Sequence, residues 1–231
     1  MSWGGDSLAY NAERKQLFVG QSGGVVSYPT SGTNIADAED EDMFSGANTV
    51  NSVKGVTFNG NDLFLAHDSG KISKTFFAIT ATTKPKGVTY SPTSATGVGE
   101  ALWVVVDGAP YDKILKLSTS TGALVTKSAF STYAAFPSAT NDVGWVNAPS
   151  ADIEGIAYMA DAGTPYLWLV GKQGWDPYLY KLNATTGALA ATYPLHNFIW
   201  NDVGGITAVG SNLYIFLKTE NKAVKLSLDG S

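Results

Sequence analysis

Residues 155–182 contain the pattern that decides the fold. The stretch opens with Gly155-Ile156-Ala157-Tyr158, continues with Tyr166-Leu167-Trp168-Leu169-Val170 and ends with Leu179-Tyr180-Lys181-Leu182. Each run is rich in aromatic and branched residues, and Gly, Asp, Asn and Pro stand between the runs, which is typical of β-strands joined by turns. Period-two alternation in the last run predicts a strand with one buried face and one wet face.

The same three-part phrase occurs five times along the chain. Its openings are Ser7, Gly55, Gly87, Gly155 and Gly205. Two copies continue with nearly the same turn, because residues 118–124 (STSTGAL) resemble residues 183–189 (NATTGAL). Gly can supply the positive φ that such a hairpin turn requires. The run after this turn predicts a fourth strand.

Repeated units of roughly 40–50 residues, each with three to four antiparallel strands, are typical of a β-propeller. We therefore predict an all-β propeller of about five blades, formed by residues 1–231 as a single domain, with inner strands that start near residues 7, 55, 87, 155 and 205. Gly opens four of these strands because backbones crowd near the axis. Helices should be scarce, since no long window shows 3.6-residue periodicity. A β-sandwich would not repeat three strands in one order.

The last repeat is one strand short, because the residues after Gly205 suffice for three strands only. Propellers commonly complete their last blade with a strand from the opposite terminus, which protects an open edge. Met1 to Gly5, anchored by Trp3, is barely long enough for this role. We expect a five-bladed ring sealed in this way. The alternative is that the chain is part of a larger ring or of a multidomain protein.

Composition excludes several classes of protein. The 231 residues include 15 Lys+Arg and 20 Asp+Glu, for a net charge of -5, and no Cys. This balance argues against a nucleic-acid-binding surface, and the lack of Cys excludes a disulfide scaffold and a Cys-ligated zinc. No apolar run approaches the ~20 residues of a membrane span. Ser, Thr, Asn and Gly replace charge on the surface, since only 15% of residues are charged.

The residues just before the inner strands should line one mouth of the axial channel. They are Asp6, Lys54, Lys86, Glu154 and Gly204. Opposite charges that are partly buried pair readily, so this set favours mutual charge compensation. The functional alternative is ligand binding by Lys54 and Lys86, or a cation held by Asp152 and Glu154.

The phrase Asp152-Ile153-Glu154-Gly155-Ile156-Ala157-Tyr158, with the two runs after it, resembles a blade of the NHL, YVTN and SMP-30-like propellers, and the repeat extends this resemblance over most of the chain. SMP-30-like lactonases hold a divalent cation with a Glu before such a Gly and with Asn and Asp from other blades. The resemblance implies Glu154 as a ligand, with Asn141, Asp142, Asn201 and Asp202 as candidates, since Asn-Asp-Val-Gly occurs twice. Oxygen ligands suit Ca²⁺ or Mg²⁺. The alternative is that Asn-Asp shapes turns.

Two further motifs have ordinary explanations. The acidic run at Asp37 and residues 39–42 is most simply a solvated loop between the first two blades. The alternative is a Ca²⁺ site, although the spacing does not match an EF-hand loop. His67-Asp68-Ser69 contains the residue types of a hydrolytic triad, but the members of a triad converge in space, whereas adjacent strand residues point to opposite faces. We interpret this segment as a turn.

Aromatic residues outside the aligned strands are the best candidates for binding. They are Tyr133, Trp145, Trp175, Tyr178 and Trp200. Such residues in loops can stack on sugars or anchor a protein partner. Residues 172–178 (KQGWDPY) interrupt the hairpin between the second and third strands of the fourth blade, and we expect them to contribute most to binding.

These observations predict a non-catalytic β-propeller that serves as a binding or structural module. Its partner would be a protein or a glycan, or the chain would form part of an oligomer or a larger extracellular, cell-surface or virion assembly. The alternative is a divalent-cation-dependent hydrolase or lactonase of the SMP-30-like type, with its site at the axial mouth.

Overall fold

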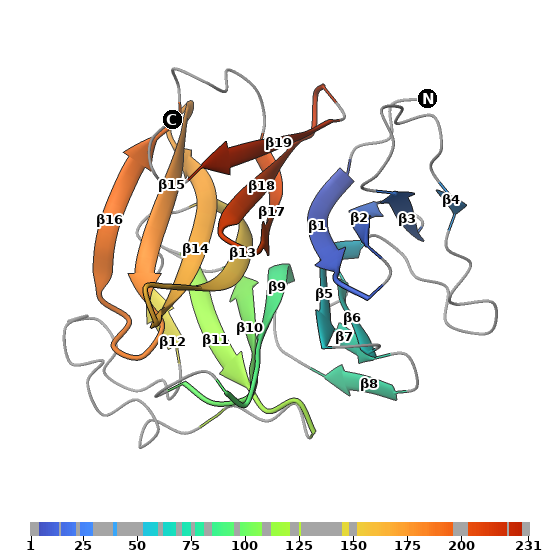
Figure 1. Ribbon diagram of the computed structural model, residues 1–231, viewed down its shortest axis with the longest axis horizontal. Helices are drawn as coiled ribbons and strands as arrows, with labels where there is room; N and C mark the ends of the chain where they lie inside the picture. The colour runs from blue at the N-terminus through green and yellow to red at the C-terminus, as the bar shows by residue number, and fades with distance from the viewer. Residues whose placement is uncertain are drawn as a thin grey trace.

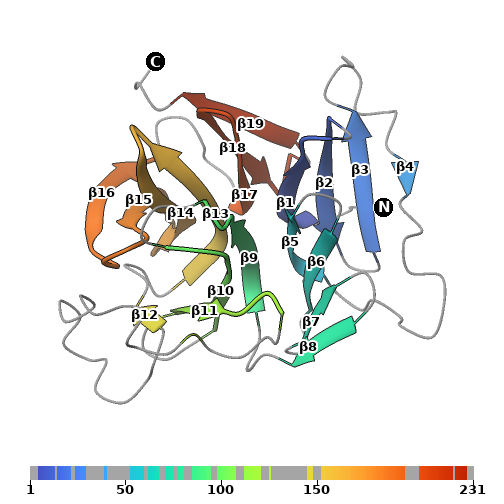
Figure 2. The ribbon, with the colours of Figure 1, turned by 60° about the horizontal axis from the view of Figure 1, so that its bottom comes forward.

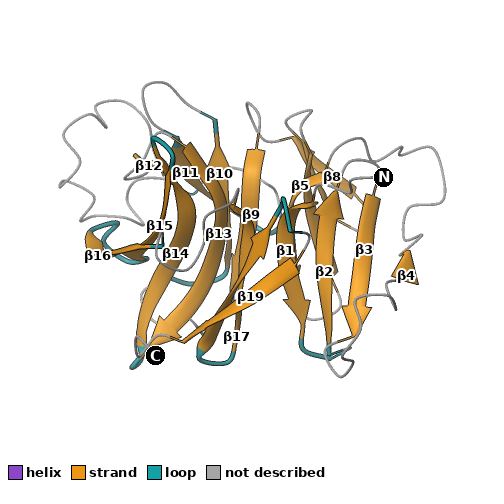
Figure 3. Cartoon of the chain, turned by 90° about the horizontal axis from the view of Figure 1, so that it is seen from above, coloured by secondary structure: helices purple, strands orange, loops and turns teal. Residues whose placement is uncertain are grey.

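The structure is a computed structural model that describes residues 5–13, 15–21, 24–29, 39–40, 53–59, 62–67, 71–74, 77–80, 85–94, 98–107, 112–120, 125, 145–147, 152–195, 203–220 and 222–227. All regular secondary structure in these ranges is β-strand, and none of it is helix (Figure 3). Accordingly, this part of the chain has no helix of the length and hydropathy needed to cross a membrane.

The strands form five antiparallel sheets in chain order, four with four strands and the last with three (Figure 1). The first sheet contains β1 (Gly5–Asn11), β2 (Gln16–Gln21), β3 (Gly24–Pro29) and β4 (Glu39–Asp40). The second contains β5 (Val53–Asn59), β6 (Asp62–His67), β7 (Lys71–Lys74) and β8 (Phe77–Thr80). The third contains β9 (Pro85–Ser91), β10 (Ala101–Val106), β11 (Lys113–Leu117) and β12 (Trp145–Asn147). The fourth contains β13 (Asp152–Asp161), β14 (Thr164–Gln173), β15 (Asp176–Asn183) and β16 (Leu189–Pro194), and the fifth contains β17 (Val203–Val209), β18 (Asn212–Leu217) and β19 (Lys222–Ser227).

The first strands of the five sheets meet at the centre of the molecule (Figure 2). Each inner strand packs beside the inner strand of the next sheet, and β1 packs beside β17, so the cycle is closed. The five sheets are therefore the blades of a β-propeller. The predicted all-β propeller of about five blades is confirmed, and each inner strand begins within a few residues of its expected start.

Glycine permits the close approach of the inner strands. A Cβ atom on Gly205 would lie 2.3 Å from the backbone nitrogen of Leu8, and a Cβ atom on Gly155 would lie 2.9 Å from the nitrogen of Ile206. Real Cβ atoms do not come this close to backbone atoms, so a larger residue would force neighbouring blades apart. The steric reason predicted for the recurring Gly is confirmed.

The core consists of apolar clusters at the junctions between blades. Phe18, Phe64, Trp103, Trp168 and Phe216 are all buried members of these clusters. Trp103 from the third blade packs with Ile153 and Ile156 of the fourth, and Trp168 from the fourth packs with Val203 and Ile206 of the fifth. Each blade is thus fixed by its two neighbours, and the second strands carry the largest buried side chains.

Three details differ from the sequence prediction. Glu39 and Asp40 form β4, which pairs with β3, although the acidic run was expected to be a loop. Charged residues are common on edge strands because they discourage pairing with other chains, which explains why an acidic pair occurs in this position. Gly5 belongs to β1 rather than to a strand that seals the fifth blade. Residues 1–4 lie outside the described residues, so sealing by the N-terminus stays a prediction.

The third difference is the length of the hairpin in the fourth blade. Residues 172–178 were expected to interrupt it, but Lys172 pairs with Pro177 and Gln173 pairs with Asp176. Only Gly174 and Trp175 form the turn, with φ of 66° at Gly174, as the first position of a type II′ turn requires. The strands continue because a Gly-initiated turn of two residues suffices to connect them.

Candidate functional site

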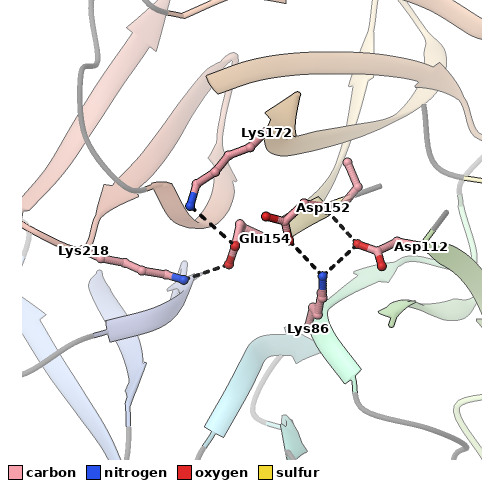
Figure 4. Close-up of polar contacts among 7 residues, drawn as sticks. Lys86, Asp112, Asp152, Glu154, Lys172 and Lys218 are labelled. Atoms are coloured by element: carbon pink, nitrogen blue, oxygen red, sulfur yellow. Dashed lines mark hydrogen bonds and ion pairs between the residues drawn. The ribbon is translucent and has the colours of Figure 1, made fainter. Parts of the chain in front are cut away.

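The mouth of the propeller lies where the inner strands begin. In the fourth blade Asp152, at the start of β13, is opposite Lys172, near the end of β14. In the third blade Val106, at the end of β10, is opposite Pro85 of β9 and Lys113 of β11. Antiparallel pairing therefore brings the starts of first and third strands and the ends of second strands to one side. Six charged residues from three blades meet on this side: Lys86, Asp112, Asp152, Glu154, Lys172 and Lys218 (Figure 4).

Lys86 joins the third blade to the fourth. Its Nζ atom lies 3.0 Å from Oδ2 of Asp112 and 3.0 Å from Oδ1 of Asp152, and donates a hydrogen bond to each. The backbone N–H of Ile153 donates to the same Oδ2 atom of Asp112 over 2.7 Å. The Asp112 side chain is fully buried. Burial lowers the pKa of Lys86, but the hydrogen bonds to Asp152 and Asp112 and the charges of both carboxylates outweigh burial, so the pKa is raised.

Glu154 joins the fourth blade to the fifth. Nζ of Lys218, which follows β18, donates to Oε2 of Glu154 over 2.8 Å. Lys172 approaches the other carboxylate oxygen at 4.0 Å. Because the three side chains are mostly buried, these charges are screened less by water than a surface pair would be. The mouth thus contains three lysines and three acids in two groups, one around Lys86 and one around Glu154.

The charges of Lys86 and Glu154 are compensated, but by residues outside the predicted set rather than by one another. Asp152 and Glu154, the candidate cation ligands, each bind a lysine in the structure. The described residues contain no group of three His, Cys, Asp or Glu side chains that could hold a metal ion. The other candidate ligands Asn141, Asp142, Asn201 and Asp202 lie outside the described residues, so a Ca²⁺ or Mg²⁺ site made with them stays a prediction.

Sequence reasoning found Lys86, Asp152 and Glu154 but missed Asp112 and Lys218. Asp112 lies 26 residues from Lys86 and 41 from Ile153, and Lys218 lies 64 residues from Glu154. Contacts this distant depend on how the blades are arranged, and local patterns do not show them. One signal in the sequence could have identified Asp112. It directly precedes the alternating run of β11, and third strands begin on the mouth side of the propeller.

Trp175 lies at the tip of the β14–β15 hairpin on the mouth side. Its side chain is 99% exposed. β14 has ten residues and β15 has eight, and they stay paired up to Gln173 and Asp176 next to the turn. The indole is therefore exposed to solvent at the end of a regular two-stranded ladder.

The other predicted binding residues fall into different settings. Tyr178 belongs to β15 rather than to a loop, is partly buried, and stacks on Tyr180 with ring centroids 6.0 Å apart. Trp145 is also in a strand, β12, and is opposite Leu115. Both assignments to loops were wrong: β15 begins at Asp176, before the alternating run that marked it in the sequence, and β12 is a strand of three residues without such a run. Lys54 is half-buried in β5. Trp200 and Tyr133 lie outside the described residues.

Comparison with known proteins identifies the fold and no closer relationship. The sequence matches no protein-family model and no curated protein. The chain is similar to a solved nidogen/laminin complex, with a TM-score of 0.62 and 12% identity over 99% of this chain and 77% of the other. It is similar to hydrazine synthase of Kuenenia stuttgartiensis, with a TM-score of 0.52 and 11% identity over 99% and 67% of the two chains.

A mitotic checkpoint complex gives a TM-score of 0.51 and 12% identity over 96% of this chain and 62% of the other. Identities this low show a shared fold alone. Together with the closed cycle of five sheets, they assign the chain to the β-propeller fold. They do not single out the NHL, YVTN or SMP-30-like propellers, so that resemblance stays a prediction.

Proposed function

We propose that the chain is a non-catalytic β-propeller binding module that takes a protein partner on the mouth side of its fourth blade. The observation that carries this proposal is Trp175, which is 99% exposed at the tip of a two-residue turn. Tryptophan is enriched among the residues that contribute most to protein interfaces, because it buries a large area with few rotatable bonds. A tip held by paired strands also loses little conformational entropy on binding.

The surroundings of Trp175 support a binding surface. Lys172 and Glu154 lie in the same blade and belong to the charged mouth, and a polar rim around an apolar anchor is usual in interfaces. Two of the similar solved structures are protein complexes, the nidogen/laminin complex and the mitotic checkpoint complex. A place in a larger extracellular, cell-surface or virion assembly is part of the same proposal.

Trp175→Ala tests the proposal, with Leu189→Ala as its matched control. Leu189 is also an exposed apolar residue of the fourth blade, at 47%, but it begins β16 at the opposite end of β15. Both proteins should melt within about 2 °C of the wild type, since surface substitutions rarely change stability by more than ~0.5 kcal/mol. Trp175→Ala should weaken binding at least about tenfold, as expected for a central aromatic residue, while Leu189→Ala should bind normally.

Candidate partners are identified by crosslinking to the full chain in its source cells. Each candidate is then purified, and its affinity is measured for the wild type, Trp175→Ala and Leu189→Ala. A partner that binds Trp175→Ala as tightly as the wild type overturns the proposal. Binding to a glycan array that Trp175→Ala loses would instead assign a carbohydrate ligand to the same tip.

The hydrolase alternative is tested by metal analysis of the purified protein. Asp152 and Glu154 each form an ion pair with a lysine. For a binding module we therefore expect the melting temperature to be the same in EDTA and in millimolar Ca²⁺ or Mg²⁺. A bound divalent ion, and a loss of stability when it is chelated, would favour the cation-dependent enzyme.

A further inference from the structure

The outer edge of the fifth blade differs from the same position in the fourth. In the fourth blade the third strand, β15, is covered by β16, which pairs with it from Tyr178↔Pro194 to Leu182↔Leu189. In the fifth blade the third strand is β19, and no strand among the described residues pairs with its outer edge. Figure 1 shows β19 as the last strand of its sheet. Within the described residues, the fifth blade thus lacks the fourth strand that each of the other blades has.

The backbone of β19 is regular enough to accept such a strand. All six of its residues pair with β18, from Asn212↔Ser227 to Leu217↔Lys222, without a shift in register. In a regular antiparallel strand, alternate residues point their N–H and C=O groups to the opposite edge. The outer edge of β19 therefore presents a straight row of backbone donors and acceptors, which is what an added strand binds.

The side chains of β19 make this edge basic and partly apolar. Val224 and Leu226 are partly buried against the cluster between the fourth and fifth blades. Lys222 and Lys225 are exposed. Because successive strand residues alternate between faces, these two lysines lie on opposite faces of the sheet. Lys222 contacts Glu220, whereas Lys225 has no ion-pair partner within the described part of the chain.

We propose that the edge of β19 binds an extended acidic segment of a partner protein, which adds to the fifth blade as its fourth strand. In antiparallel pairing, the partner residue opposite Lys225 is followed by those opposite Val224, Ala223 and Lys222. The recognised segment therefore has an acid, an apolar residue, any residue and a second acid, in this order. Opposite charges directly across two strands attract, and a valine opposite Val224 extends the apolar stripe.

The charge of β19 favours this occupant over a second copy of the chain. Self-pairing would bring two lysine-bearing strands together, and like charges across a sheet are destabilising. In the fourth blade, the strand in the corresponding position is β16, which pairs with β15. Five of its six residues are exposed, so its contacts with the blade are mostly backbone hydrogen bonds. An acidic partner gains the same ladder together with favourable charge.

A labelled peptide tests the proposal on the full chain. The probe is Thr-Thr-Glu-Val-Thr-Glu-Thr-Thr, blocked at both ends and carrying a fluorophore, and fluorescence anisotropy measures its dissociation constant. The first control peptide has both glutamates replaced by lysine, and the second has the glutamates two positions apart, so that both lie on one face. We expect the probe to bind about fivefold or more tightly than either control, and hydrogen exchange to slow at β19.

Lys225→Glu should weaken binding of the probe at least fivefold. Lys15 is an exposed turn residue of the first blade, so Lys15→Glu should leave binding unchanged. Trp175→Ala should also leave it unchanged, which separates this site from the proposed anchor. Equal binding of the three peptides, protection by the probe elsewhere than β19, or dimerisation through β19 without peptide would each overturn the proposal. So would slow exchange of all β19 amides in the free protein, because the edge would then already be covered.

Discussion

The third and fourth blades contain the same pair of side chains in two different environments. Trp103 of β10 is opposite Lys116 of β11, and Trp168 of β14 is opposite Lys181 of β15. In both blades the ammonium group lies over the ring, 5.2 Å from the centroid of Trp103 in one and 5.0 Å from that of Trp168 in the other. The repeat thus reproduces a cation–π contact.

The surroundings of the two lysines differ. Lys116 is only 4% exposed and donates to the backbone carbonyl of Val98. Lys181 is paired with the carboxylate of Asp161. The two indoles differ as well, because Nε1 of Trp103 donates to Oγ of Ser91 over 3.1 Å. Nε1 of Trp168 has no acceptor among the described residues.

The hairpin between the first two strands accounts for these differences. In the fourth blade it is a turn of two residues, since Asp161 pairs with Thr164. In the third blade Ser91 pairs with Ala101, and the longer connection brings Val98 over Lys116. One repeated sequence phrase therefore gives a buried lysine or an ion-paired lysine according to the length of a neighbouring loop.

The largest effect should come from cutting the contact that joins the two blades. Asp112→Ala removes the buried carboxylate that accepts from Lys86 and from the N–H of Ile153. It leaves a buried N–H without its acceptor and Lys86 with one carboxylate fewer, so we expect a loss of about 3 kcal/mol in the free energy of unfolding. Urea denaturation followed by tryptophan fluorescence measures it.

Asp112→Asn is the matched control for this prediction. It keeps an oxygen that can accept from Ile153 and removes only the charge, so the expected loss is about 1 kcal/mol. If Asp112→Ala unfolds at the same urea concentration as the wild type, the charged mouth does not hold the third and fourth blades together.

A smaller difference is expected between the inner-strand glycines of the two blades. A Cβ on Gly155 would meet the backbone of the fifth blade, with Ile206 N at 2.9 Å and Gly205 Cα at 3.0 Å. A Cβ on Gly87 would first meet Gly155 Cα at 3.2 Å. Overpacking typically costs about 1–3 kcal/mol, so we expect about 2 kcal/mol for Gly155→Ala and about 1 for Gly87→Ala.

Thermal unfolding of the two variants, side by side, checks this order. An equal loss for both, or a larger one for Gly87→Ala, would show that the blades adjust their spacing by more than a few tenths of an ångström.

The sequence was sufficient to predict the blades but not the side-chain contacts between them. Gly155 and the runs around Trp168 and Lys181 are local patterns, so they predicted strands, their order and their number. Asp112 and Lys218 could not be predicted as members of the mouth, because their partners are distant in the chain. The exposure of Trp175 lies between these cases: the sequence suggested it, but only the two-residue turn in the structure explains it.

The smallest effect concerns the buried lysine itself. Burial lowers the pKa of Lys116 from its ordinary value of 10.5. Between the lowered pKa and 10.5 the unfolded chain binds more protons at this site than the folded protein does, so Lys116 makes the free energy of unfolding rise as pH increases through that interval. Lys116→Met fills a similar volume without a charge and removes this rise.

We therefore expect Lys116→Met to gain stability relative to the wild type as pH falls through the lowered pKa of Lys116, because only the wild type must then charge a buried lysine. Urea denaturation at several pH values measures it, and subtracting the two curves removes the titration of groups that both proteins share, such as Tyr90 and Tyr158, whose pKa burial raises. Lys181→Met is the control from the fourth blade, where the substitution deprives Asp161 of its partner and should lower the melting temperature. A Lys116→Met curve that keeps the slope of the wild type would show that the longer hairpin does not isolate Lys116 from water, and the contrast between the two blades would then be one of hydrogen-bond partners alone.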